Sequence, residues 1–183
     1  MSYFLKNYNR INYPIASDAN RGLRNAQLGA IYAIGSHFTI NKNEPALVVM
    51  PTGSGKTAVL NLSAYFLRAN RVLVISSSVM VRGQIVDEFN TLATLKSSNV
   101  FHSKLKTPKV KEIKSPIKSI EEWDALKKFD VIVGIPNSIN AGINNEFKPP
   151  NDLFDLILVD EAHHVPAFTC KFRSNRPPQT GLN

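Results

Sequence analysis

A glycine-rich segment, Pro51-Thr52-Gly53-Ser54-Gly55-Lys56-Thr57, carries the residue types needed to hold phosphate groups. Its glycines let the backbone close around an anion with the N–H groups pointing inward, and a helix that begins there adds a favourable dipole. Lys56 then reaches the β- and γ-phosphates of ATP, and the Thr57 hydroxyl takes a Mg²⁺ position. The segment predicts phosphate contacts from Thr52, Gly53, Ser54 and Gly55. The alternative is a glycine-rich turn, and Met50 stands where the strict pattern has its first glycine.

Two adjacent acids, Asp160 and Glu161, follow the apolar run Leu156–Val159. A buried strand that ends in two acids delivers both carboxylates to the carboxyl edge of a parallel sheet, where open α/β folds bind ligands. Asp160 would hold Mg²⁺, usually through water, and Glu161 would orient and deprotonate the attacking water. Such a pair can also begin a solvated helix. The phosphate loop upstream favours the catalytic interpretation.

Short apolar runs alternate with amphipathic stretches in the elements that must position these residues. The runs predict strands buried on both faces; they are Ala46–Met50, Val72–Ile75, Asp130–Val133, Leu156–Val159 and, more weakly, Asn99–Phe101. Helices are predicted over Lys56–Ala69 and Val79–Leu92, the second with Arg82 off its apolar stripe. Ser119 and Glu122 form a capping-box pattern for a short helix that buries Trp123 and Leu126. The alternation predicts an α/β layer sandwich with right-handed crossovers.

Composition limits the class of protein further. The 183 residues are enough for one domain, the formal charge is +8, and the single cysteine, Cys170, excludes an internal disulfide. No apolar run approaches the roughly 18 residues of a membrane helix, and the start lacks a signal peptide, so we expect a cytoplasmic chain with no membrane partner. Residues 1–22 and the tail 168–183 are expected to be loose ends.

Lysines are concentrated between Lys96 and Lys118, where seven lysines and one acid give 7 − 1 = +6. Pro108 and Pro116 lie inside this basic segment, which predicts a long connection or a ragged hairpin. It is either a solvated loop or a flap that contacts nucleic-acid phosphates beside the loops that follow the strands.

These motifs together resemble the DEAD/DEAH-like superfamily 2 helicases, specifically their first RecA-like, ATP-binding domain. PTGSGKT is similar to motif I and Asp160–His163 to motif II, and the resemblance spans about 23–167. Leu23-Arg24-Asn25-Ala26-Gln27 resembles the element whose glutamine reads adenine, which implies cofactor contacts from Arg24 and Gln27; a glutamine on a helix surface is the alternative. Ser76–Ser78 with Gln84 resembles motif Ia, and 133–138 weakly resembles motif Ib, both facing nucleic acid. The resemblance implies a three-layer P-loop NTPase fold with a mostly parallel sheet.

The doubled histidine of DEAHH and the stretch RNAQLGAIYAIGSHF resemble the restriction-enzyme and defence-associated branch, which implies DNA rather than RNA and further subunits as partners. His163 would couple the nucleotide site to motif III, and His164 is expected to be structural. No motif III and no second domain with an arginine finger follow, so the resemblance implies a truncated domain, incomplete at its C-terminus and inactive alone. In the family the motif III strand lies between those of motifs I and II, which implies an unfilled position here. A non-motor P-loop ATPase that docks a partner through the basic segment remains the alternative.

Overall fold

The computed structural model describes residues 1–139 and 148–161. Its centre is a sheet of four parallel strands in the order β2 (Val110–Glu112), β3 (Val131–Gly134), β1 (Val72–Ile75) and β4 (Leu156–Val159). In register, Val72 lies opposite Val131 on one side and Leu156 on the other. Three of the four strands lie where the apolar runs predict them, which confirms the α/β class.

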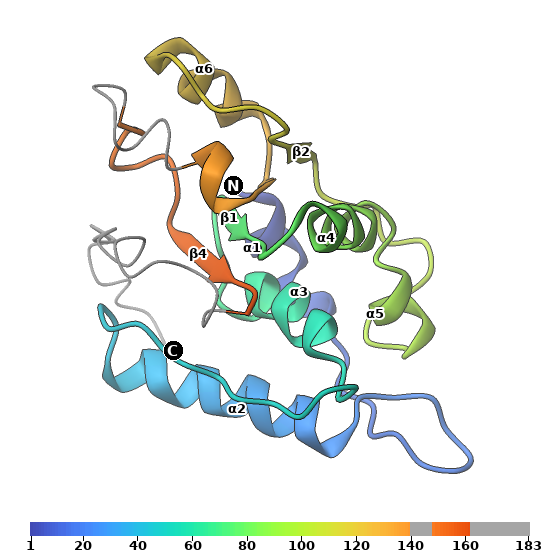
Figure 1. Cartoon of the computed structure of the whole chain (residues 1–183). Coiled ribbons are helices and arrows are strands. Elements are labelled where there is room, and N and C mark those ends of the chain that lie inside the picture. The colour runs from blue at the N-terminus through green and yellow to red at the C-terminus, as the bar shows by residue number, and fades with distance from the viewer. Residues whose placement is uncertain (140–147, 162–183) are drawn as a thin grey trace.

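Helices flank the sheet, as Figure 1 shows. In chain order they are α1 (Tyr3–Asn7), α2 (Asn25–Ile40), α3 (Lys56–Phe66), α4 (Val79–Thr91), α5 (Ala93–Ser97) and α6 (Ile120–Asp124), with 3-10 turns at Tyr8–Arg10 and Ala125–Lys128. Serine hydroxyls cap α4 and α6, the second at Ser119 as the sequence predicts and the first at Ser78. The hydroxyl of Ser78 accepts the N–H of Val81 at the start of α4, and that of Ser119 accepts the N–H of Glu122 at the start of α6.

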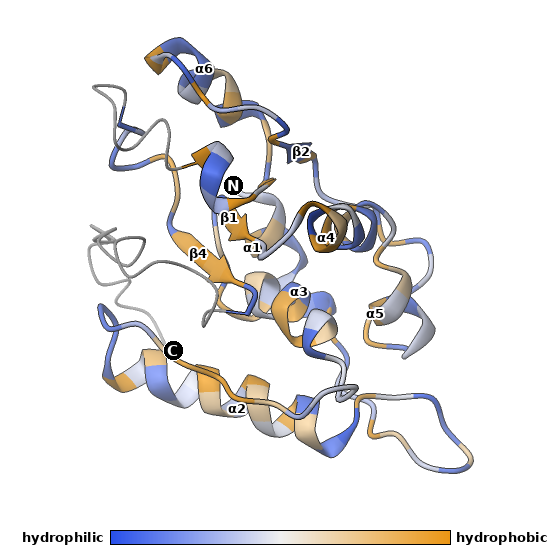
Figure 2. Cartoon of the chain, in the orientation of Figure 1, coloured by the Kyte–Doolittle hydropathy of each residue, from blue (hydrophilic) through white to orange (hydrophobic). Residues whose placement is uncertain are grey.

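Side chains alternate between two apolar layers because successive strand residues point to opposite faces. Val72 and Val74 of β1 pack in the core under α3 and α4, where Phe89 is fully buried. Leu73 and Ile75 face the other layer, which contains Trp123 of α6. Strands β1 and β4 are accordingly hydrophobic in Figure 2, whereas the edge strand β2, which contains Lys111 and Glu112, is largely hydrophilic. Two covered faces make the three-layer arrangement of a P-loop domain.

The strand predicted at Ala46–Met50 is wrong. The chain between α2 and α3 runs past α2 without strand pairing, and only its middle part is hydrophobic in Figure 2. Leu47 is 79% exposed and Val49 85% exposed. An apolar run becomes a strand only where neighbouring strands accept its hydrogen bonds, and the described sheet ends at β4. Ala46–Met50 is therefore an apolar stretch without a strand partner among the described residues.

The weak strand expected at Asn99–Phe101 is also wrong, and the basic segment is more ordered than expected. Val100 and Phe101 are buried in the turn that follows α5, where both N–H groups bond to the carbonyl of Leu95. Within the basic segment, Val110–Glu112 forms the edge strand β2, parallel to β3. A parallel edge strand excludes the ragged hairpin.

The amino terminus is not a loose end. Phe4 is fully buried, with its ring 4.8 Å from that of Tyr65 in an edge-to-face arrangement. Ser2 caps α1 and also donates to the carbonyl of Ala69, which precedes β1. Because α1 packs on α3, Phe4 belongs to the core of the domain, and this part of the chain is held in place around it.

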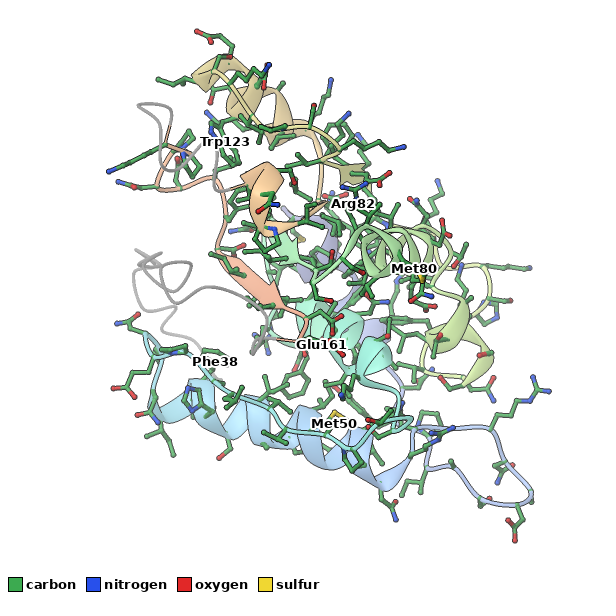
Figure 3. The ribbon with its side chains drawn as sticks, viewed as in Figure 1. Phe38, Met50, Met80, Arg82, Trp123 and Glu161 are labelled. Atoms are coloured by element: carbon green, nitrogen blue, oxygen red, sulfur yellow. The ribbon has the colours of Figure 1, made fainter. Side chains whose placement is uncertain are left out.

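Two helices differ in detail from their predicted form. The helix predicted to reach Ala69 ends at Phe66, since Arg68 takes a positive φ of 53° that stops the helix. Arg82 of α4 is buried rather than off the apolar stripe, because its Nε donates to Glu112 Oε1 at 2.8 Å and its Nη1 to the carbonyl of Ile113. These bonds join α4 to the edge strand β2 (Figure 3).

One arginine ties the starts of three strands together. Arg71, just before β1, donates from its guanidinium to the carbonyls of Phe129, Leu153 and Lys127 at 2.6 to 3.0 Å. Its backbone N–H and that of Asn70 donate to the carboxylate of Asp155, just before β4. The amino edge of the sheet is thus fixed by charge-assisted hydrogen bonds, which are about twice as strong as neutral ones.

Candidate nucleotide site

The glycine-rich loop lies directly before α3, whose first residues are Lys56 and Thr57. Gly53 and Gly55 have φ angles of 76° and 87°, in the left-handed region that favours glycine. The N–H and hydroxyl of Ser54 both donate to the carbonyl of Pro51, which closes the turn. Lys56 and Thr57 are exposed. The loop therefore presents an ammonium, a hydroxyl and a helix start to solvent together.

Arg24 and Gln27, which the sequence proposes as cofactor contacts, both touch this loop. Arg24 Nη1 donates to the carbonyl of Gly53 at 2.6 Å, and Gln27 Nε2 donates to the carbonyl of Gly55 at 3.3 Å. Gln27 Oε1 also accepts the N–H of Arg24 at the start of α2. Gln27 is buried, so it is not a glutamine on a helix surface. The start of α2 and the loop form one unit.

The acidic pair follows β4 at the carboxyl edge of the sheet. The N–H of Asp160 donates to the carbonyl of Ile75 at 2.9 Å, so Asp160 continues the register of β4 against β1. Glu161 leaves the strand with a φ of 52° and is exposed, and Figure 3 shows it where β4 ends beside α3. Both carboxylates are delivered to the sheet edge that the sequence predicts.

Charge links this pair to the loop. Burial raises the pKa of Asp160, the neighbouring Glu161 carboxylate raises this pKa further, and the Lys56 ammonium opposes both effects. Lys56 is therefore close enough to act on Asp160, although they are about one hundred positions apart in the chain. The fold brings together the motifs that carry Lys56 and Asp160.

The donor set suits a hard cation. Carboxylate, hydroxyl and water oxygens are the ligands Mg²⁺ prefers, usually with only one or two protein groups and several waters. Thr57 and Asp160 would supply one hydroxyl and one carboxylate, and phosphates would supply further oxygens. Across residues 1–139 and 148–161, no group of three or more His, Cys, Asp or Glu side chains could hold a metal by itself. The chemistry of this donor set is compatible with Mg²⁺.

The serines that resemble motif Ia are mostly engaged within the protein. Ser76 is buried and donates to the carbonyl of Ser78, while the hydroxyl of Ser78 caps α4. Ser77 makes no hydrogen bond within the described part of the chain, and Gln84 is exposed. In the stretch that resembles motif Ib, Ser138 is buried and bonds to Ile135. Among these groups Ser77 and Gln84 are the ones open to an external ligand.

Some predicted positions lie outside the described residues, and one polar group was not anticipated. His163, His164 and the boundary at Ala167 fall in 162–183. Asn61, on α3 one turn beyond Lys56, is fully buried, and neither its Nδ2 nor its Oδ1 has a hydrogen-bond partner among the described residues. No sequence signal distinguishes Asn61, because an asparagine within a helix usually faces solvent. Within the described residues, no helix combines the length and the hydropathy that crossing a membrane requires.

The parallel sheet with helices on both faces, the glycine loop at the head of α3 and the acids after β4 define a P-loop ATPase domain of the superfamily 2 helicase-like class. A comparison with family models matches residues 20–174 to the family described as type III restriction enzyme, res subunit. The chain belongs to this family. A comparison with curated proteins finds no match.

Proposed function

We propose that the chain is the ATP-binding part of a nucleic-acid-dependent ATPase of the helicase or translocase type. The observation that carries the proposal is the placement of the glycine loop at the head of α3 and of the acids after β4, and the Lys56 ammonium, which lowers the pKa of Asp160, agrees with it. A parallel α/β sheet binds its ligands at that edge. The family match supports a helicase-like P-loop domain.

In this proposal each side chain has a separate task. Lys56 pairs with the β- and γ-phosphates, and the loop from Thr52 to Gly55 surrounds them with backbone N–H groups. Glu161 orients the attacking water and accepts its proton, since its exposed carboxylate lies next to Asp160 at the sheet edge. Arg24 and Gln27 hold the loop in place and give the adenine a donor and an acceptor beside it.

Mg²⁺, when bound with the nucleotide, would neutralise charge on the phosphate oxygens. Thr57 and Asp160 are the residues that would hold it. The raised pKa of Asp160 shows that its charged form is disfavoured without a cation, and the Lys56 ammonium compensates only in part. A divalent ion beside Asp160 would favour its ionised form.

Nucleic acid, DNA rather than RNA, is the proposed partner at the carboxyl edge, with other subunits of a restriction complex as protein partners. The formal charge of +8 and the free groups at Ser77 and Gln84 support contacts to a phosphate backbone. Rapid hydrolysis needs an arginine finger worth about 10³–10⁵ in rate. In our proposal a second domain supplies it, so residues 1–183 alone bind ATP but turn it over negligibly.

The test of the nucleotide site is calorimetric titration of the chain with ATP and Mg²⁺. Lys56→Ala should weaken binding roughly 30-fold or more, because truncating one partner of a charge pair costs about 2–5 kcal/mol. Lys42→Ala removes an equal charge from an exposed turn after α2 and should leave the affinity unchanged. Equal affinities in wild type and Lys56→Ala would falsify the assignment.

Turnover is tested in the same preparations. We expect no ATPase activity above background from the wild-type chain, with or without DNA. DNA-stimulated turnover that Glu161→Gln abolishes would contradict the need for a second domain, while supporting the role of Glu161. ATP binding with no effect of DNA on a parent protein that includes the second domain would favour the non-motor alternative.

A further inference from the structure

A small cavity of about 190 Å³ lies between two segments far apart in the sequence. Arg10, from the 3-10 turn after α1, forms one wall, and His102, Lys104 and Leu105 of the basic segment form the other. A water molecule occupies about 30 Å³ in the liquid, so the cavity has room for a small anion with some of its hydration. No acidic side chain is among these four lining residues.

This cavity lies at the amino edge of the sheet, opposite the nucleotide site. Downstream in the same segment, the carbonyl of Lys109 accepts the N–H of Asp130, immediately before β3 begins. On the other wall, the guanidinium carbon of Arg68, just after α3, lies 4.0 Å from the centroid of the Tyr8 ring, and Tyr8 belongs to the same 3-10 turn as Arg10. Because α3 starts at the loop that carries Lys56, its other end marks the opposite edge.

The basic segment is therefore divided between the two edges. Lys114 and Lys118 follow β2, and the carbonyl of Ser138 accepts the N–H of Ile117 near the start of the loop after β3. Lys104, by contrast, precedes β2 by several residues and lines the amino-edge cavity. A single flap beside the carboxyl-edge loops does not describe all these lysines.

Hydrogen bonds and burial hold both walls of the cavity in place. The Tyr3 hydroxyl donates to the carbonyl of Lys106, and the N–H of Asn12 donates to that of Val100 at 2.9 Å. The N–H of Leu105 donates to the carbonyl of His102 at 2.9 Å, and the Leu105 side chain is buried. The side chains of Arg10, His102 and Lys104 are exposed, while the backbone that carries them is held in place by these bonds.

The side chains present donors only. His102 Nδ1 accepts the N–H of Lys104 at 3.2 Å, so a neutral ring carries its proton on Nε2 and offers it as a donor. Arg10 supplies a guanidinium fork, whose geometry matches two oxygens of a phosphate, and Lys104 supplies a mobile ammonium. Three donor groups with no competing acceptor select an anion.

We propose that the cavity lined by Arg10, His102 and Lys104 binds a phosphate group of a nucleic-acid backbone, at a second contact region distinct from the carboxyl edge. The proposal rests on the proposed function, because it takes the phosphate to belong to the nucleic acid that the domain engages. A free phosphate ion would satisfy the same donors, so the experiment distinguishes the two sources.

The test measures binding of a fluorescein-labelled single-stranded DNA oligonucleotide to the full chain by anisotropy, over a series of salt concentrations. Each contact to a single strand contributes about 0.7 to the slope of log K against log salt. The Arg10→Ser/Lys104→Ser variant should flatten the slope by roughly 1.4 and weaken binding at low salt. Arg21→Ser/Lys42→Ser removes the same two charges at exposed sites away from the cavity and should leave the slope unchanged.

Lys104→Glu offers a second variant, which should weaken oligonucleotide binding more than Lys104→Ser does because it adds repulsion. An unchanged slope in the cavity variant, or an equal loss in the control variant, overturns the proposal. Inorganic phosphate that binds the cavity, as followed by histidine NMR shifts, while the slope stays unchanged would assign the site to free phosphate and overturn the nucleic-acid source.

ATP titration of the same samples separates this inference from the proposed function. If the wild-type chain does not bind ATP, the assignment of the nucleotide site is wrong. Normal ATP binding, with no oligonucleotide binding by the wild-type chain, leaves that site intact and overturns the second contact region. The cavity variants lie at the other edge and should bind ATP as the wild type does.

Discussion

Gln27 Nε2 donates to the carbonyl oxygen of Gly55 at 3.3 Å, and a Cβ at Gly55 would lie 2.2 Å from that same nitrogen. The amide of Gln27 therefore occupies the space that any side chain at position 55 would need. Its Oε1 accepts the N–H of Arg24, so the first turn of α2 and the phosphate loop are packed as one piece. The φ of 87° favours glycine at 55, and any side chain there would also have to displace the Gln27 amide.

Gly55→Ala should destabilise the domain more than Gly53→Ala does. Both positions have positive φ, which costs alanine about 1–2 kcal/mol. Gly53 has open space around its Cβ position, whereas alanine at 55 must also displace Gln27 and lose a bond worth about 0.5–1.5 kcal/mol. Urea unfolding of the two variants measures the difference. Equal losses would show that Gln27 moves away without cost.

Asp160→Asn should raise the free energy of unfolding at neutral pH. The folded-state pKa of Asp160 is raised, mainly by burial and then by Glu161, so folding disfavours its charged form. Its contribution to stability is full below the ordinary pKa of 3.8 and is lost as pH rises through the raised folded value. The advantage of Asp160→Asn should therefore appear over that window and persist at neutral pH.

Thermal unfolding between about pH 4 and pH 7 tests this dependence. Asp18→Asn, on an exposed turn, is the matched control and should show no such trend. Lys56→Ala should move the window to higher pH, since the Lys56 ammonium lowers the pKa of Asp160. A variant advantage that grows as the pH falls would have the wrong sign and refute the argument.

Arg82→Met should destabilise the domain by about 3 kcal/mol. The side chain of Arg82 is 6% exposed, and its removal leaves Glu112 Oε1 and the carbonyl of Ile113 without their donor in a largely buried position. Lys114 also pairs with Glu112, at 3.3 Å, but is 75% exposed. Lys114→Met should cost no more than about 1 kcal/mol. Comparable losses in the two variants, by chemical unfolding, would mean that Arg82 contributes only as a surface charge.

Asn61→Leu should stabilise the chain. Its amide is fully buried with both polar atoms unpartnered among the described residues, and such desolvation costs about 1–3 kcal/mol. Ser63, two positions later, is also buried, but its hydroxyl donates to the carbonyl of Val59 at 2.7 Å. Ser63→Ala should therefore give no comparable gain in melting temperature. A lower melting temperature for Asn61→Leu would contradict this prediction, because it would mean that the Asn61 amide has a hydrogen-bond partner in the folded chain.

Strands β1, β3 and β4 could be predicted because each is a run of apolar residues; β1 and β3 are buried along their whole length, whereas β4, at the end of the described sheet, is half-buried. Ser78 and Ser119 likewise mark helix starts through bonds made within three residues. These signals are local. The motifs of the candidate site are local too, since Gly53 to Thr57 and Asp160 with Glu161 are each contiguous in the chain.

The rest depends on partners that are distant in sequence. Leu47 and Val49 resemble strand residues, yet no described strand pairs with them. Arg82 is buried because it bonds to Glu112, thirty positions later in the chain. Phe4 is buried because its ring packs against that of Tyr65. Lys111 lies in a strand although charge argues against one there. Apolar periodicity does not report such pairings.

The bonds of Arg71 and Asp155 make the two edges of the sheet unequal. Charge-assisted bonds join β1, β3 and β4 where they begin, whereas at the edge with Lys56 and Asp160 the strands are joined by neutral backbone bonds, such as that from the N–H of Asp160 to the carbonyl of Ile75. Amide exchange should therefore be slower at Arg71, whose N–H donates to a carboxylate, than at Asp160, whose N–H donates to a carbonyl.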